Sequence, residues 1–207
     1  MKEPLLPWYR HPGREAGVDE AGRGCLAGPV TAAAVILPEA FDLEGLNDSK
    51  KLTERQREHL RGRIEEQAVA WAVAMIDNRR IDEMNILRAT WAAMHQAVKG
   101  LKKTPDFLLI DGRNFLPYPG IPHRCIIKGD SKYAAIAAAS ILAKTWRDQY
   151  MKELHEKYPV YGWAGNKGYP TRLHRKAIRQ YGTTPYHRMT FRLLDEQQKI
   201  IFPGVDE

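Results

Sequence analysis

The chain has 207 residues, 43% of them hydrophobic, which is enough to bury a substantial core in one large domain. A net charge of +7 favours an acidic partner such as a nucleic acid. There is no apolar run of membrane-spanning length, no apolar signal segment after Met1, and only Cys25 and Cys125 are available for disulfides. These features argue against a membrane-spanning or disulfide-stapled protein, and we expect a cytoplasmic location.

The net charge is concentrated in one segment. Residues 160–192 contain no Asp or Glu but seven basic side chains: Lys167, Arg172, Arg175, Lys176, Arg179, Arg188 and Arg192. Because these are seven of 32 Lys and Arg, the rest of the chain has 25 basic against 25 acidic side chains. Aromatic residues alternate with the cations, a composition typical of a nucleic-acid-binding surface, although a solvated helix face is also basic. We therefore predict a single domain over 1–207, in which 160–207 form a basic substrate-binding segment.

Proline and glycine residues that interrupt regular structure, together with the hydrophobic periodicity, predict the helices and strands in the first half of the chain. In chain order they are a lead-in over 1–15, a strand ending at Asp19, a strand over Val30–Leu37, a helix after Thr53, a strand over 69–75 and a helix over 84–98 ending at Gly100. Thr53 and Gln56 have the spacing of a capping box.

The second half predicts two short strands and several helices. They are strands over 107–110 and 125–127, a long helix over 132–157 with Ser131 as its cap, a helix over Thr171–Tyr181 ending at Gly182, and a last helix over 193–201. The early strands can pair antiparallel and the later ones can add in parallel through helical crossovers. The expected fold class is α/β, with a mixed sheet flanked by helices.

Four acidic residues follow apolar, strand-like runs and lie at or near glycines: Asp19, Glu20, Asp111 and Asp130. The carboxyl ends of strands are the usual ligand sites in such sheets, so these acids can converge. Converging carboxylates repel one another unless a hard cation such as Mg²⁺ or Mn²⁺ joins them. Two such ions about 4 Å apart hydrolyse phosphodiesters in many enzymes. Since adjacent residues of a regular strand face opposite sides, Asp19 and Glu20 are expected to share a site only where the strand bends.

Two other hypotheses compete with a nuclease. Gly22-Arg23-Gly24-Cys25-Leu26-Ala27 fits a dinucleotide-binding fingerprint, but that motif requires a following helix, and Gly28-Pro29 with a β-branched run follows instead. A non-catalytic, basic RNA-binding module remains open, with the acids merely ending strands. Nuclease activity that a chelator abolishes would separate this module from an enzyme.

The chain resembles bacterial type 2 ribonuclease H (ribonuclease HII) over nearly its whole length. The resemblance rests on these motifs, in order: Gly17-Val18-Asp19-Glu20-Ala21-Gly22-Arg23-Gly24, Asn47-Asp48-Ser49-Lys50-Lys51-Leu52, Asp111-Gly112, Lys128-Gly129-Asp130-Ser131, Ala138-Ala139-Ser140-Ile141-Leu142-Ala143-Lys144, Asn166-Lys167-Gly168-Tyr169 and His187-Arg188. It implies the ribonuclease H fold, with a mixed five-stranded sheet. Trp146 departs from the expected pattern, a change that we assign to packing.

The resemblance also implies roles for single residues. Asp19, Glu20 and Asp111 would be metal ligands, and Asp130 the fourth active-site acid. Gly22-Arg23-Gly24 would sense the ribose 2′-OH, and Tyr169 would stack on the sugar beside an RNA–DNA junction. We further predict substrate contacts by Lys50, Arg172 and His174. Asp148 is either a group supporting the acids or only a salt-bridge partner.

The implied activity is an endoribonuclease that requires Mn²⁺ or Mg²⁺, with two ions when substrate is bound. Its substrates would be RNA–DNA hybrids and ribonucleotides embedded in duplex DNA, cut to leave 3′-OH and 5′-phosphate ends. We expect a monomer without an obligatory protein partner, and no sliding-clamp-binding tail after Phe202.

Overall fold

The computed structural model describes residues 4–10, 14–46, 49 and 52–194. Lys50 and residues 195–201 of the predicted last helix lie outside these ranges, while Leu193 and Leu194 are not helical. The strands are β1 (Glu15–Ala21), β2 (Val30–Ile36), β3 (Ala70–Ile76), β4 (Phe107–Asp111) and β5 (His123–Ile126). The helices are α1 (Glu54–Gln67), α2 (Asn78–Met84), α3 (Ile86–Lys99), α4 (Ala134–Lys157), α5 (Trp163–Asn166) and α6 (Arg172–Tyr181), with short 3-10 helices η2 (Gly129–Ser131) and η3 (Pro159–Tyr161).

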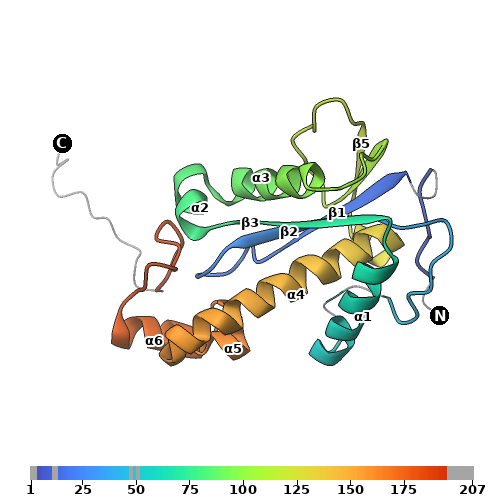
Figure 1. Cartoon of the computed structure of the whole chain (residues 1–207). Coiled ribbons are helices and arrows are strands. Elements are labelled where there is room, and N and C mark those ends of the chain that lie inside the picture. Colours follow the sequence, from blue (N-terminus) through green and yellow to red (C-terminus); the bar gives the residue numbers. More distant parts are fainter. Residues whose placement is uncertain (1–3, 11–13, 47–48, 50–51, 195–207) are drawn as a thin grey trace, which may run out of the picture.

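The five strands form one mixed sheet in the order β3-β2-β1-β4-β5. The β1–β2 and β2–β3 pairs are antiparallel, whereas β1–β4 and β4–β5 are parallel, which confirms the predicted arrangement. Helices α1 and α4 cover one face of the sheet and α2 and α3 cover the other (Figure 1). The chain is thus a three-layer α/β structure, and no helix in its described part combines the length and apolarity needed to cross a bilayer.

Strand β2 lies at the middle of the core, and all seven of its residues are buried. Ala32 and Ala34 face the apolar cluster formed with α3, while Ala33 and Val35 face the cluster formed with α4. Such a run of small and β-branched residues suits a strand covered on both faces. Gly17 of the neighbouring β1 permits an equally close approach, since a Cβ there would lie 2.1 Å from the Ala135 carbonyl carbon of α4.

Local signals place most elements, and several predicted boundaries need correction. The Thr53–Gln56 capping box is present at the start of α1. The predicted helix over 84–98 corresponds to α3, which begins at Ile86 because Asn85 adopts a φ of 70° and caps it with its side chain. Helix α2 was not predicted, and the strand predicted over 125–127 lies at His123–Ile126. Strand β1 continues past Asp19 to Ala21. Ser131 does not cap α4: it lies in η2, and Tyr133 precedes the first turn of α4.

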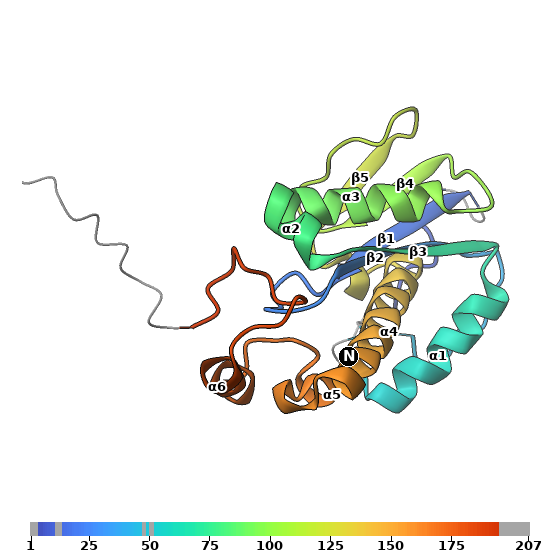
Figure 2. The same ribbon diagram turned by 60° about the vertical axis from the view of Figure 1, so that its left-hand side comes forward.

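The C-terminal segment, residues 159–194, packs against the end of α4 (Figure 2). Its apolar contacts join Trp163 and Ile178 to Leu26, Met151 and Leu154. A backbone bridge pairs His187 with Ala27, so the segment is joined directly to the loop after β1.

Candidate active site

A pocket of about 210 Å³ lies where β1 and β4 end. The described residues that line it are Asp19, Glu20, Ala21, Gly22, Arg23, Gly24, Ser49, Asp111, Ser140, Lys144 and Tyr169. The structure therefore brings together three of the predicted acids, the Gly-Arg-Gly turn and the predicted tyrosine. These residues come from distant parts of the sequence and meet at the carboxyl ends of two parallel strands.

Asp19 and Glu20 reach this pocket without a bend in the strand, contrary to the prediction. Both are in regular register with β2, opposite Ala33 and Ala32 respectively. Glu20 also lines a second cavity of about 290 Å³ together with Trp91 of α3, on the face opposite α4. The two carboxylates thus emerge on opposite faces, and they share the pocket because it lies at the end of the strand.

The electrostatics of the pocket disfavour three negative charges. Burial, followed by the charges of Glu20 and Asp111, raises the pKa of Asp19 well above its usual value. Asp19 accepts a hydrogen bond from the Glu20 N–H at 2.7 Å, and Asp111 accepts one from the Gly129 N–H at 2.7 Å. Glu20 lies 3.3 Å from the guanidinium of Arg23. A bound cation would remove the repulsion, so the donor set fits a hard divalent metal.

Among the described residues, the acidic side chains do not by themselves form a complete set of metal ligands. In the described part of the chain, no three His, Cys, Asp or Glu side chains are close enough to form a ready metal cluster. Asp130 is buried in η2, directly after the glycine that binds Asp111, and the described pocket lining does not include it. A role for Asp130 as the fourth active-site acid therefore stays a prediction.

Three polar residues of the pocket belong to motifs named above but were given no role by the sequence analysis: Ser49, Ser140 and Lys144. The Ser49 and Ser140 hydroxyls lie 2.9 Å apart, and Lys144 forms an ion pair of 2.6 Å with the buried carboxylate of Asp148. Asp148 is therefore the partner of a pocket lysine. Ser140, Lys144 and Asp148 are spaced by four in an alanine-rich helix, so they share one face. The four-residue spacing of these polar side chains was the one signal in the sequence that pointed to a polar helix face.

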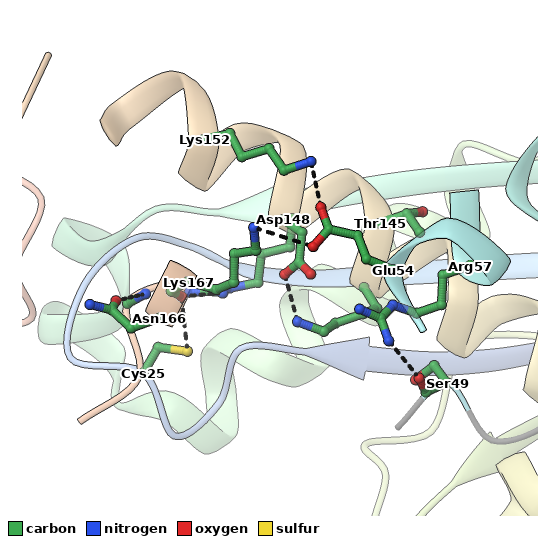
Figure 3. Close-up of polar contacts among 12 residues, drawn as sticks. Cys25, Ser49, Glu54, Arg57, Thr145, Asp148, Lys152, Asn166 and Lys167 are labelled. Carbon is green, nitrogen blue, oxygen red and sulfur yellow. Dashed lines mark hydrogen bonds and ion pairs between the residues drawn. The ribbon is translucent and has the colours of Figure 1, made fainter. Parts of the chain in front are cut away.

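The start of α1 is fixed next to this stripe (Figure 3). Arg57 donates a hydrogen bond to the Ser49 carbonyl at 3.1 Å, and Glu54 pairs with Lys152 of α4 at 2.6 Å. Glu54 also lies 3.9 Å from the ammonium of Lys167. These contacts place Ser49 beside the pocket and connect α1 to the loop that carries Tyr169.

Known proteins match this chain over most of its length. A family model described as Ribonuclease HII matches residues 16–194. Ribonuclease HII of Parabacteroides distasonis is 61% identical over 199 residues, which cover 96% of this chain and 100% of that protein. The chain belongs to the ribonuclease HII family. The three acids, the Gly-Arg-Gly turn and Tyr169 all lie within the matched range.

Solved structures of this family have the same fold. Ribonuclease H2 of Pyrococcus horikoshii superposes with a TM-score of 0.72 at 29% identity, over 87% of this chain and 94% of that one. Ribonuclease HII of Archaeoglobus fulgidus, solved as a complex with PCNA, gives a TM-score of 0.73 at 26% identity, over 89% and 98% of the two chains. The ribonuclease H-like fold class inferred from the sequence is thereby confirmed.

Tyr169 forms one wall of the pocket. This residue is 39% exposed, with the Lys144 ammonium 5.8 Å and the Arg147 guanidinium 6.0 Å from the ring centroid. The Tyr169 carbonyl lies 3.0 Å from Nδ1 of His174. His174 is 0% exposed, which corrects the prediction that its ring contacts nucleic acid. Its role is indirect, because it holds the backbone of the pocket tyrosine.

A buried hydrogen-bond network surrounds His174. Trp163 donates to Nε2 of His174 at 3.0 Å, and Nε2 of His187 lies 3.2 Å from the same atom. The Thr184 N–H donates to Nδ1 of His187 at 2.9 Å. Burial lowers the pKa of both histidines, and the neighbouring His174 lowers that of His187 further, to about 4. Both rings are therefore neutral at pH 7.

The seven cations of the basic window divide into two groups. Arg172, Lys176, Arg179 and Arg192 are exposed. Lys167 and Arg188 are buried, and Arg175 donates to the carbonyls of Arg192 and Leu193, so these three act within the protein. Four of the seven basic side chains in the predicted substrate-binding segment are thus exposed.

Proposed function

We propose that the chain is a divalent-metal-dependent endoribonuclease that cuts the RNA strand of RNA–DNA hybrids. It also nicks duplex DNA on the 5′ side of an embedded ribonucleotide, leaving 3′-OH and 5′-phosphate ends. The observation that carries this proposal is the single pocket in which Asp19, Glu20 and Asp111 face the Gly-Arg-Gly turn. Membership of the ribonuclease HII family supports it.

The acids would hold Mn²⁺ or Mg²⁺, with two ions present when substrate is bound. Asp19, Glu20 and Asp111 are the proposed ligands, and Asp130 is proposed as the fourth acid because it follows Gly129, which donates to Asp111. When bound, such cations activate a water and stabilise the leaving oxygen of a phosphodiester. Lys144 places a positive charge beside the same carboxylates.

Recognition of the substrate is assigned to the turn and to the C-terminal segment. Gly22, Arg23 and Gly24 would contact the ribose 2′-OH, the one group that distinguishes RNA from DNA at a given position. Tyr169 would pack against the adjoining sugar. Arg172 and the other exposed cations of α6 would contact phosphates, as would Lys50. Residues 1–207 would act as one catalytic domain, with 160–207 as its basic substrate-binding segment.

Duplexes containing ribonucleotides are the proposed partners, and a cytoplasmic monomer is the proposed state. The scarcity of cysteines, only Cys25 and Cys125 in 207 residues, supports this location. The predicted absence of a clamp-binding tail concerns residues beyond Phe202, which the structure does not describe. It stays a prediction, and the PCNA complex is a property of the Archaeoglobus protein.

A cleavage assay with two labelled duplexes tests the proposal. One is a uniform RNA–DNA hybrid and the other is duplex DNA with one ribonucleotide. Both should be cut in Mn²⁺, and excess EDTA should abolish cleavage. Asp111→Asn, which removes a ligand charge with little change in volume, should lower the rate by roughly a thousandfold or more.

Hybrid binding by Asp111→Asn in Ca²⁺ should largely persist and serves as the folding control. Wild-type protein that binds both duplexes without cutting either in any divalent metal would identify a non-catalytic binding module. Full activity of the purified Asp111→Asn variant would remove this residue from the mechanism.

A further inference from the structure

Arg188 is a fully buried arginine that lies beneath the Gly-Arg-Gly turn. It is 0% exposed and donates four hydrogen bonds to backbone carbonyls. Two of them go to Gly22 at 2.8 Å and Arg23 at 2.9 Å, and two go to Gly28 and Pro29, both at 3.0 Å. The guanidinium therefore holds the carbonyls on both sides of this loop. Only arginine has a planar fork of donors that can contact four acceptors at once.

The carbonyl contacts fix the direction of two N–H groups. No cis peptide bond is found in the described chain, so each carbonyl points opposite to the N–H of the next residue. Because Arg188 binds the carbonyls of Gly22 and Arg23, the N–H groups of Arg23 and Gly24 point away from Arg188. Within the described residues, neither N–H donates to a backbone carbonyl. A Cβ on Gly24 would meet no protein atom within 4 Å, so there is open space beside this residue, and all three residues of the turn line the pocket.

The backbone around Arg188 is itself anchored to the body of the fold. Its N–H donates to the Leu26 carbonyl at 2.8 Å. Asn78 of α2 donates to the carbonyls of Pro185 and His187, both at 2.9 Å. Asp82 of the same helix accepts the N–H groups of Met189 at 2.8 Å and Thr190 at 3.0 Å. Arg188 is thus held on both sides by a helix more than 100 residues earlier in the chain.

We propose that Arg188 is a positioning residue that aims the N–H groups of Arg23 and Gly24 into the pocket, and so sets the selectivity for a 2′-OH. The inference rests on the proposed function, because it deepens the recognition of the sugar by the Gly-Arg-Gly turn. Arg188 acts through the backbone and does not touch the substrate. Without the Arg188 guanidinium, the peptide planes that carry the Arg23 and Gly24 N–H groups would be free to rotate. The two N–H groups would then no longer point in the same direction.

The test compares Arg188→Lys with Arg175→Lys. Arg175 is the control, because its guanidinium also donates to two backbone carbonyls of the C-terminal segment, those of Arg192 and Leu193, but in the described part of the chain it neither contacts the Gly-Arg-Gly turn nor lines the pocket. Dissociation constants are measured in Ca²⁺ for two DNA duplexes that carry one ribonucleotide or one 2′-fluoro nucleotide at the same position. Fluorine is a poor acceptor and no donor, so the ratio of the two constants reports the 2′-OH contact.

Both variants should lower the melting temperature. Arg188→Lys should also reduce the ratio roughly tenfold, the usual value of one or two hydrogen bonds, whereas Arg175→Lys should leave it near the wild-type value. An unchanged ratio in Arg188→Lys, or an equal fall in both variants, would overturn the proposal. Wild-type protein that neither cuts the ribonucleotide duplex nor prefers it would instead contradict the proposed function.

Amide NMR of the wild-type protein keeps the proposal testable if Arg188→Lys does not fold. The ribonucleotide duplex should move the amide proton resonances of Arg23 and Gly24 more than the 2′-fluoro duplex does. Equal shifts with both duplexes would contradict the assigned direction of these N–H groups.

Discussion

The α/β body and the C-terminal segment are built on different physical principles. In the body, β2 and the facing sides of α3 and α4 bury two apolar clusters, and the pocket acids Asp19, Glu20 and Asp111 lie at strand ends. In the segment, the interior contains two histidines and Arg188, each held by directional hydrogen bonds. Apolar packing makes a rigid platform, whereas hydrogen bonds determine where single groups point. This difference matches a body that performs the chemistry and a segment that orients the recognising groups.

Salt dependence of binding gives the largest expected contrast between the two regions. Changing Arg172, Lys176 and Arg179 to Ala should lower the slope of log affinity against log salt by about 2 to 3, since each lost phosphate contact removes about 0.9. Over a fourfold change in salt this corresponds to roughly fortyfold in affinity. The measurement is hybrid binding in Ca²⁺ between 50 and 200 mM salt, which are about the usual test concentrations.

Lys99, Lys102 and Lys103 provide the control triplet, because they are exposed cations at the C-terminal end of α3 and the loop after it. Their replacement by Ala should leave the slope unchanged. Equal slopes for the two triple variants would place the nucleic acid away from α6.

The pH dependence of stability should distinguish the buried histidines from the apolar body. The folded-state pKa of His187 is lowered to about 4 from its ordinary value of 6.5, so below pH 6.5 the unfolded chain binds more protons. Stability is then complete above pH 6.5 and is lost as the pH falls toward 4. Between pH 7.5 and 5 the loss from His187 should be about 2 kcal/mol, or roughly thirtyfold in the folding constant.

Urea unfolding at the two pH values measures this loss. His187→Asn keeps an acceptor near the Thr184 N–H but does not titrate in this range, so it should remove most of the effect. His59→Asn, at an exposed position of α1, is the control, and this variant should retain the pH dependence of stability. The same pH dependence in His187→Asn would show that other groups cause it.

Junction recognition gives the smallest of the expected effects. Tyr169→Ala should slow cutting at a lone ribonucleotide in duplex DNA by about tenfold, since stacking on an aromatic ring contributes about 1–3 kcal/mol. A uniform hybrid should be affected less, because it contains no RNA–DNA junction. Initial rates on the two substrates at saturating metal provide the ratio to compare.

Tyr181→Ala is the matched variant, since Tyr181 lies in the same segment and is 54% exposed but does not line the pocket. It should change neither rate by more than about twofold. If Tyr169→Ala slowed both substrates equally, the tyrosine would serve general binding and not the junction.

Some parts of the structure depended only on neighbouring residues, and these were predictable. The capping box of α1, the glycine that ends α6 and the run of small and β-branched residues in β2 each act over a few positions. The start of α3 was placed two residues early because the apolar period begins at Met84, whereas Asn85, with its φ of 70°, caps the helix. Helix α2 was not predicted. Ser140 and Lys144 were given no role because their spacing with Asp148 shows only that they share one helix face, and the pocket that this face meets is formed by strands distant in the sequence.

The sequence by itself determined the fold class and the chemistry of the acids, since carboxylates that follow apolar runs beside glycines are typical of a cation site at strand ends. Only the tertiary structure decided which cations meet solvent. Composition counted Arg188 and Arg172 alike, yet one is buried beneath the Gly-Arg-Gly turn and the other is exposed on α6. The physical reason is that a guanidinium is stable in the interior only where backbone carbonyls converge on it. Here those carbonyls belong to residues about 160 positions earlier in the chain.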